Sequence, residues 1–99
     1  MNYRNRKLLN LAKECPFCMS CMRVNHGDVV AAHSNQIVDG KGMGIKAHDY
    51  RIAYLCGDCH MAIDQGKDMA KEQRKLRWED AHRRTIGWLF ESGHLEVRK

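Results

Sequence analysis

The sequence lacks any long apolar run. No stretch of its 99 residues approaches the roughly 20 apolar residues that a membrane span needs. Residues 1–7 carry three basic side chains and lack the apolar stretch of a secretory signal. Internal repeats and low-complexity segments are also missing. We therefore expect a single cytoplasmic domain over residues 1–99, with no membrane partner.

The sequence also lacks the dispersed cysteines of a disulfide framework. Its five cysteines form two local clusters, Cys15/Cys18/Cys21 and Cys56/Cys59. Clusters of this kind are typical of metal binding, because a Cys-x-x-Cys step lets one tight turn present two sulfurs to a single zinc ion. No βαβ pattern surrounds the second cluster, which argues against a thiol redox protein. A structural metal would also suit a domain too small to gain much stability from its core alone.

Tetrahedral zinc needs four ligands, and five cysteines are present. Cys56 and Cys59 supply one half of the expected site, and two of Cys15, Cys18 and Cys21 supply the other. The third is expected to be a spare thiol, buried as a small apolar group. Spacing alone does not choose among them.

The charge distribution favours a polyanionic partner. The formal net charge is +5 and the pI is about 9.1. Residues 1–23 and 67–99 are rich in Lys and Arg, whereas residues 24–66 contain five aspartates and three basic side chains. A basic frame around a middle segment with carboxylates and histidines is what a metal-dependent enzyme acting on nucleic acid needs. A solvated surface would carry similar charges.

The hydrophobic pattern predicts a small α+β domain with a core at about 14–66. We expect a short helix at 6–13, on which Arg6 and Lys7 either contact phosphate or face solvent. Short β-favouring runs predict strands at 29–32 and 52–55. A helical arm is expected at about 68–92, with Asp68 capping its start and Ser92-Gly93 ending it.

Two histidines lie where they could do chemistry. His33 follows the first expected strand, and histidine is the natural general base near neutral pH; a structural histidine is the alternative. His60 directly follows Cys59, and Asp64 lies four residues further on. On a helix, His60 and Asp64 would share one face and could bind a second, harder ion.

A glycine-rich loop separates the two strands. Glycines occupy positions 40, 42 and 44, and Lys41 and Lys46 add positive charge. The loop lacks the G-x-x-x-x-G-K-[ST] pattern of a nucleotide P-loop. Because glycine lets backbone amides approach a phosphate closely, we interpret it as a clamp for the substrate backbone. A plain flexible connector is the alternative.

In combination, these motifs resemble those of the small phage and prophage HNH-type nucleases, which belong to the ββα-metal endonucleases. The resemblance covers about residues 6–91 and is carried by the cysteine clusters, Ala32-His33-Ser34-Asn35, residues 40–49, and Cys56-x-x-Cys59-His60-x-x-x-Asp64. It implies a treble-clef-like core, in which a two-stranded hairpin precedes a helix. A structural zinc ion would lie behind this core and a catalytic divalent ion in front of it.

The resemblance also implies roles for particular residues. His33 is similar to the general base of the HNH pattern and His60 to its metal-binding histidine, and Asp64 occupies the place of a further ligand. Ala32 stands where many relatives have a metal-binding aspartate, so another ligand must compensate. Asp49 is our first choice, because carboxylate oxygen suits Mg²⁺ or Mn²⁺.

Other positions remain open. Asn35 and His48 are alternatives to Asp49, and Arg51 lies near the place of the middle asparagine of the pattern. Relatives usually space their first two thiols more widely, which favours Cys15 and Cys21 over Cys18 as zinc ligands.

The sequence therefore predicts a metal-dependent DNA endonuclease of phage or prophage DNA recombination or processing. It would act in the cytoplasm of a bacterial host as a monomer or homodimer, with a recombination protein as a further partner. The alternative is a zinc-stabilised DNA-binding or recombination-accessory protein without catalysis.

Overall fold

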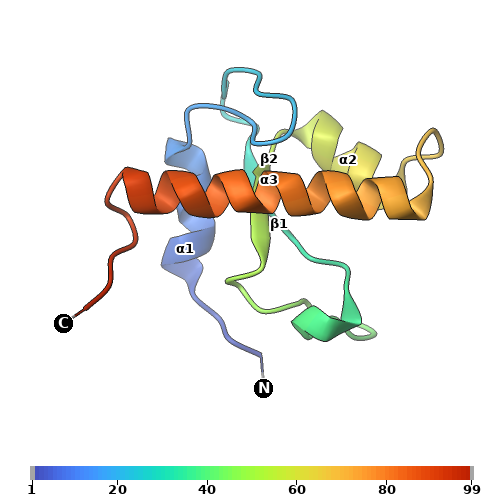
Figure 1. Ribbon diagram of the computed structural model, residues 1–99, viewed down its shortest axis with the longest axis horizontal. Coiled ribbons are helices and arrows are strands. Elements are labelled where there is room, and N and C mark those ends of the chain that lie inside the picture. The colour runs from blue at the N-terminus through green and yellow to red at the C-terminus, as the bar shows by residue number, and fades with distance from the viewer. Residues whose placement is uncertain (1, 99) are drawn as a thin grey trace.

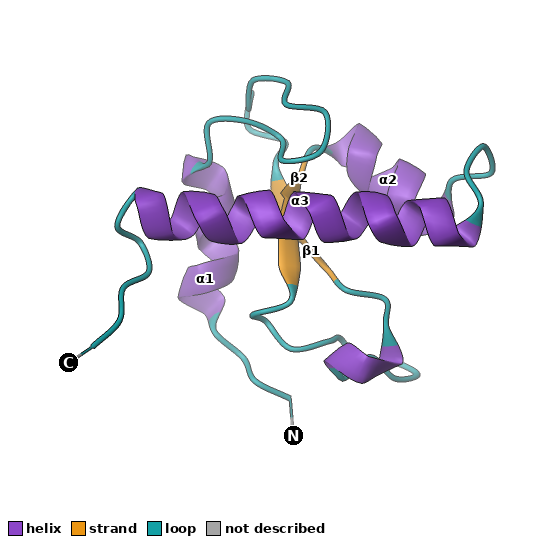
Figure 2. Ribbon diagram, in the orientation of Figure 1, coloured by secondary structure: helices purple, strands orange, loops and turns teal. Residues whose placement is uncertain are grey.

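The computed structural model describes residues 2–98, in which a small sheet lies between helices (Figure 1). Loops connect these elements, and the longest helix runs across the sheet (Figure 2). The elements in chain order are α1 (Arg6–Asn10), the 3₁₀ turn η1 (Leu11–Glu14), β1 (Val30–His33), the 3₁₀ turn η2 (Ile37–Asp39), β2 (Ile52–Leu55), α2 (Gly57–Gln65) and α3 (Lys71–Glu91). This confirms a small α+β fold in which two strands precede a helix.

The sheet consists of β1 and β2, paired antiparallel with Val30 opposite Leu55 and His33 opposite Ile52. All four residues of β2 are buried, so the strand is covered on both faces. Two strands alone are marginally stable in water, and the helices packed on them supply the missing core. The expected strand at 52–55 is confirmed, and the first strand begins and ends one residue later than expected.

The outer edge of β2 is bound by groups that do not belong to a strand. The N–H of Tyr54 donates to Thr85 Oγ1 (3.0 Å), and its carbonyl accepts from the N–H of Met19 (2.9 Å). The carbonyl of Ile52 accepts from His82 Nδ1 (2.6 Å). Burial lowers the pKa of His82, so a neutral ring makes this bond. Both ends of β2 are thus fixed to α3.

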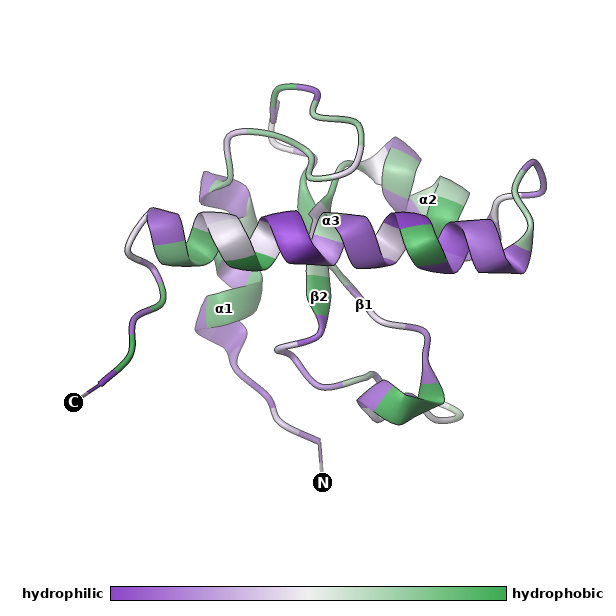
Figure 3. Ribbon diagram, in the orientation of Figure 1, coloured by the Kyte–Doolittle hydropathy of each residue, from purple (hydrophilic) through white to green (hydrophobic). Residues whose placement is uncertain are grey.

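Helix α3 packs on the sheet through an apolar stripe and exposes a hydrophilic face. Trp78, Ala81, Thr85 and Leu89 are buried and recur every three or four residues. The face turned to the viewer in Figure 3 is mainly hydrophilic. This long helix therefore carries much of the core on one side.

The start of α3 differs from the expectation. The helix begins at Lys71, where the N–H of Ala70 donates to Gln73 Oε1 (3.1 Å), and Asp68 does not cap it. Gln73 reaches back over the first turn and takes the capping role. The end is as expected, at Ser92 and at Gly93, whose φ is +81°.

Among the described residues, no helix combines the length and the apolar character that crossing a membrane requires.

Candidate metal centre and histidine site

Four cysteines converge on one point. The sulfurs of Cys18, Cys21, Cys56 and Cys59 all lie within 4.8 Å of one another. Cys21 Sγ and Cys56 Sγ are 3.9 Å apart, and sulfurs bound at 2.3 Å to a tetrahedral zinc ion would be about 3.8 Å apart. The described cysteines are all free thiols, without disulfides. The group could hold a metal ion, and its geometry is consistent with structural zinc.

Two local turns present the four sulfurs. The first is a short hairpin in which the N–H of Cys18 donates to the Arg23 carbonyl and the N–H of Met22 to the Cys18 carbonyl, both at 2.9 Å. Met22 has φ +62°, which lets the chain reverse just after Cys21. The second is the junction of β2 and α2, where Cys56 precedes the helix and Cys59 lies in its first turn.

The preference for Cys15 as a zinc ligand was wrong, and Cys18 takes its place. Cys15 lies outside the group of four and before the hairpin turn. The Cys15 thiol donates to the Phe17 carbonyl (3.2 Å), and Cys15 is 1% exposed. Burial raises the pKa of this thiol. Cys15 is therefore the buried spare thiol that the count of five cysteines predicted.

Two arginines contact the thiols from outside the group. Arg23 Nη2 lies 3.5 Å from Cys56 Sγ, and Arg77 Nη2 lies 3.3 Å from Cys59 Sγ. Burial, followed by hydrogen bonds that the protonated thiol makes with the neighbouring cysteines, raises the pKa of Cys59 to about 12. Without a metal this thiol keeps its proton. Four thiolates around Zn²⁺ would carry a net charge of about −2, which two guanidinium groups offset.

His33 is held by a buried carboxylate. Its Nε2 lies 2.7 Å from Asp49 Oδ1, and the side chains of His33 and Asp49 are 13% and 2% exposed. Asp49 also accepts from the N–H of Asn5 (2.6 Å) and from Arg4 Nη1 (2.9 Å). Burial alone would raise the pKa of Asp49, but hydrogen bonds from His33, Asn5 and Arg4 hold it below its ordinary value. Asp49 is therefore ionised and orients the ring.

These contacts correct the role expected for Asp49 as a ligand of a catalytic ion. Within residues 2–98, the four cysteines are the only group of three or more His, Cys, Asp or Glu side chains that converge on one point. Asp49 does not form such a group with His60 and Asp64. The physical reason is that both of its oxygens bind the N-terminal segment and His33.

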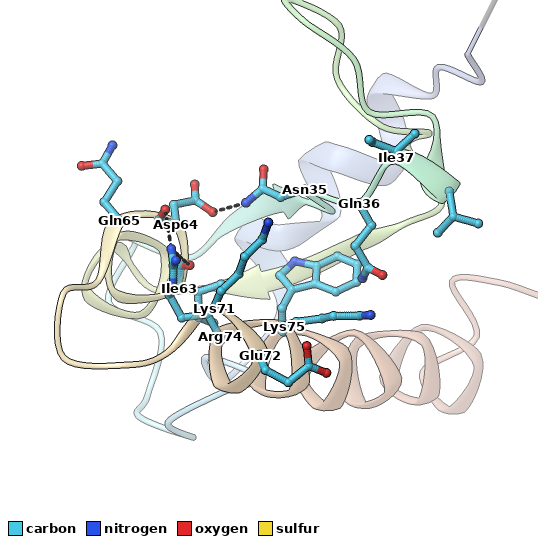
Figure 4. A pocket seen from close by; sticks show the side chains of 12 residues that line it. Asn35, Gln36, Ile37, Ile63, Asp64, Gln65, Lys71, Glu72, Arg74 and Lys75 are labelled. Carbon is cyan, nitrogen blue, oxygen red and sulfur yellow. Dashed lines mark hydrogen bonds between the residues drawn. The ribbon is translucent and has the colours of Figure 1, made fainter.

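His60 and Asp64 form the second histidine–carboxylate pair, on one face of α2 as expected. His60 Nε2 lies 3.0 Å from Asp64 Oδ2, and each side chain is about one-third exposed. Asn35, two residues beyond His33, donates to Asp64 Oδ1 (3.0 Å; Figure 4). This bond joins the end of β1 to α2.

The glycine loop is pinned by the N-terminal segment. Asn2 Nδ2 donates to the carbonyls of Gly40 (2.7 Å) and Lys46 (2.8 Å). Gly40 has φ +89°, and a Cβ atom at this position would lie 2.8 Å from Asn2 Nδ2, so glycine is required here. Lys41, which directly follows Gly40, makes no ion pair with a described residue. The N-terminal segment thus fixes both ends of the loop.

The remaining predicted residues lie apart from the histidine pairs or have structural contacts. Arg6 and Lys7 are exposed on α1. His48 accepts from the N–H of Tyr3 (3.0 Å) and stacks on Tyr50, with the ring centroids 4.8 Å apart. His48 therefore serves the local packing of this segment.

Sequence reasoning missed a network around Arg51. Its guanidinium lies 2.9 Å from Asp39 Oδ1 and 2.6 Å from Glu79 Oε2, and 4.9 Å above the centroid of the Trp78 ring. Gln36 also donates to Glu79. These contacts fasten η2 and the segment before it to α3. An arginine just before a strand could have signalled an ion pair, but its partners are 12 and 28 residues away in the chain.

Comparison with protein-family models, with curated proteins and with solved structures found no match to this chain.

Proposed function

We propose that the protein is a metal-dependent DNA endonuclease of the HNH type, acting in phage or prophage DNA recombination or processing. One observation carries the proposal. Two histidine–carboxylate pairs, His33 with Asp49 and His60 with Asp64, occur at the end of β1 and on α2, and the Asn35–Asp64 hydrogen bond joins these two elements. The four-cysteine group beside the start of α2 would fix the helix that carries His60.

His33 is suited to act as a general base through Nδ1. The ionised Asp49 accepts a hydrogen bond from Nε2–H, so the neutral ring keeps its lone pair on Nδ1. Nδ1 makes no hydrogen bond with a described residue. There it would take a proton from the water that attacks phosphorus, and Asp49 would stabilise the imidazolium that forms.

His60 and Asp64 would hold Mg²⁺ or Mn²⁺. Bound there, the ion would polarise the phosphate and offset the charge that develops on the leaving 3′ oxygen. Asn35 fixes one oxygen of Asp64, which leaves the other directed at His60 Nε2. The chain thus presents one imidazole nitrogen and one carboxylate oxygen as neighbouring ligands, and water and substrate would supply the others.

The test is nicking of supercoiled plasmid with Mg²⁺ or Mn²⁺. His33→Ala and His60→Ala should each lose nicking by about 100-fold or more, with DNA binding and zinc content retained. His26→Ala is the matched control, because His26 is exposed and makes no hydrogen bond with a described residue. Full nicking by both variants would contradict the proposal.

A second function, a zinc-stabilised DNA-binding or recombination-accessory protein without catalysis, is favoured by one observation. Both oxygens of Asp64 are already engaged, by His60 and Asn35, and no third His, Cys, Asp or Glu side chain converges on the pair among the described residues. Salt-sensitive DNA binding without nicking under any divalent metal would support this function instead.

A further inference from the structure

A groove of about 850 Å³ opens beside the His60–Asp64 pair. Its walls are the C-terminal half of α2, residues 35–38 and the first turns of α3 (Figure 4). Asp64 lines one end of this groove, so a molecule lying in it would reach the second histidine–carboxylate pair. None of the nucleic-acid-binding residues predicted from the sequence, on α1 and the glycine loop, lines it.

One wall of the groove is cationic. Lys71, Arg74 and Lys75 line it from α3, against Glu72 on the same helix and Asp64 at the end. Arg74 Nη1 donates to the carbonyls of Ile63 (3.4 Å) and Asp64 (3.1 Å), which fixes its guanidinium beside the histidine pair. Neither lysine forms an ion pair with a described residue. These two charges are available to an anion.

The wall formed by residues 35–38 carries two polar amides, Asn35 and Gln36, and two apolar side chains that are held in place. Ile37 and Val38 lie on η2, line the groove, and are each 86% exposed. They add nothing to the core. The turn η2 that carries them is nevertheless fixed, because its last residue, Asp39, accepts a hydrogen bond from Ser34 Oγ (2.5 Å) and pairs with Arg51. The fold thus presents two apolar side chains rigidly toward solvent, opposite a row of cations.

We propose that this groove binds a single strand of DNA and leads it to the His60–Asp64 pair. The proposal rests on the nuclease function and specifies its substrate as DNA with an unpaired segment. Phosphates would lie against Lys71, Arg74 and Lys75, and base faces against Ile37 and Val38. A single strand exposes both kinds of surface side by side, whereas a duplex keeps its base faces stacked inside and would leave these two apolar side chains uncovered.

The cationic wall is tested by binding of fluorescein-labelled oligo-dT and of a duplex of equal length, by anisotropy at several salt concentrations. The zinc-loaded full chain carries His33→Ala, so that it binds without cutting. Adding Lys71→Ala and Lys75→Ala should make the plot of log affinity for oligo-dT against log salt concentration less steep by about 1.4. The affinity for oligo-dT at 0.1 M salt should fall about 25-fold. Lys13→Ala with Arg98→Ala removes the same charge elsewhere and should leave the slope unchanged.

The role of the two apolar side chains is tested by Ile37→Ser with Val38→Ser, which the exposure of both residues makes safe for folding. Affinity for oligo-dT should fall at an unchanged salt slope, and duplex affinity should stay the same. An equal loss for duplex, or no loss for oligo-dT in either pair of variants, would overturn the proposal. So would a change in sedimentation caused by the serines, because the groove would then be covered by a second copy of the chain.

The two proposals fail separately. If the groove variants cut plasmid and oligo-dT as well as the parent protein does, the proposed role of the groove is refuted and the nuclease proposal stands. Groove-dependent binding of oligo-dT by a protein that never nicks would refute the nuclease and support strand binding.

Discussion

Replacing Cys18 or Cys15 by serine tests whether the four converging thiols hold a metal and Cys15 does not. Cys18 Sγ belongs to the converging group, whereas Cys15 Sγ donates to the Phe17 carbonyl at 3.2 Å. Structural zinc contributes about 10–16 kcal/mol in zinc-finger peptides, and a whole domain is stable by about 5–15 kcal/mol. Loss of one ligand therefore threatens the entire fold. In Cys15→Ser the hydroxyl can donate to the same carbonyl, and the cost should be about 1 kcal/mol.

The assay combines zinc content per purified chain, by elemental analysis, with thermal unfolding followed by circular dichroism. Cys15→Ser should keep one zinc ion per chain and lose roughly 4–8 °C in Tm. Cys18→Ser should hold clearly less than one zinc ion and unfold far below the parent protein. Full zinc in Cys18→Ser together with loss of zinc in Cys15→Ser would refute the assignment of the four ligands.

Three further predictions concern the charged contacts. Asp49→Asn should lower nicking by about 100-fold or more at unchanged zinc content. Because the pKa of Asp49 is lowered, its ionised form stabilises the fold above about pH 4, and this stabilisation is lost as the pH falls further. Acid unfolding of the variant, followed by circular dichroism, should therefore depend less on pH in that range. Arg77→Met removes the donor to Cys59 Sγ and should weaken zinc binding 10- to 100-fold in competition with a chromogenic chelator. Glu79→Gln breaks the ion pair with Arg51 and should cost about 1–3 kcal/mol in urea unfolding.

Each of these has a clear contrary result. Zinc loss in the Asp49 variant would mean that the histidine site and the metal centre are not independent. Unchanged chelator competition in the Arg77 variant would show that its contact with sulfur does not stabilise the metal. Urea stability equal to that of the parent protein would show that Glu79 and Arg51 are held by other contacts.

The elements that local pattern defines were predictable. The strand at 52–55 is an apolar run of β-favouring residues, and its limits agree with β2 (Ile52–Leu55). The pairing of His60 with Asp64 followed from helical spacing alone. The start of α3 was misplaced because Asp68 and Gln73 both suit a helix start, and only the fold selects the second.

The misassigned cysteine shows where spacing stops being informative. Cys15 and Cys18 each begin a Cys-x-x-Cys step, and the choice depends on which step forms the hairpin turn. Phe17 pairs with Val24 across that turn, which places Cys18 and Cys21 at its tip. Neither residue signals this pairing in the sequence. The preference for Cys15 came from the family resemblance, and the local turn overrode it.

The partners of His33 were beyond sequence reasoning for a different reason. Asp49 is oriented by Arg4 and Asn5, which lie 45 and 44 residues away in the chain. Such contacts depend on how the N-terminal segment crosses the glycine loop, and no periodicity encodes that path. The sequence could name Asp49 as important, but its role as a partner of the histidine emerged only from the fold.

The outer edge of β2 has a consequence for how copies of this chain can meet. Its outward carbonyls at Ile52 and Tyr54 and the Tyr54 N–H are already bound by His82, Met19 and Thr85. A strand from another molecule therefore finds these three backbone groups already bonded, which guards the β2 edge of the sheet against edge-to-edge pairing. Two copies of the chain could pair along this edge of β2 only by breaking these hydrogen bonds.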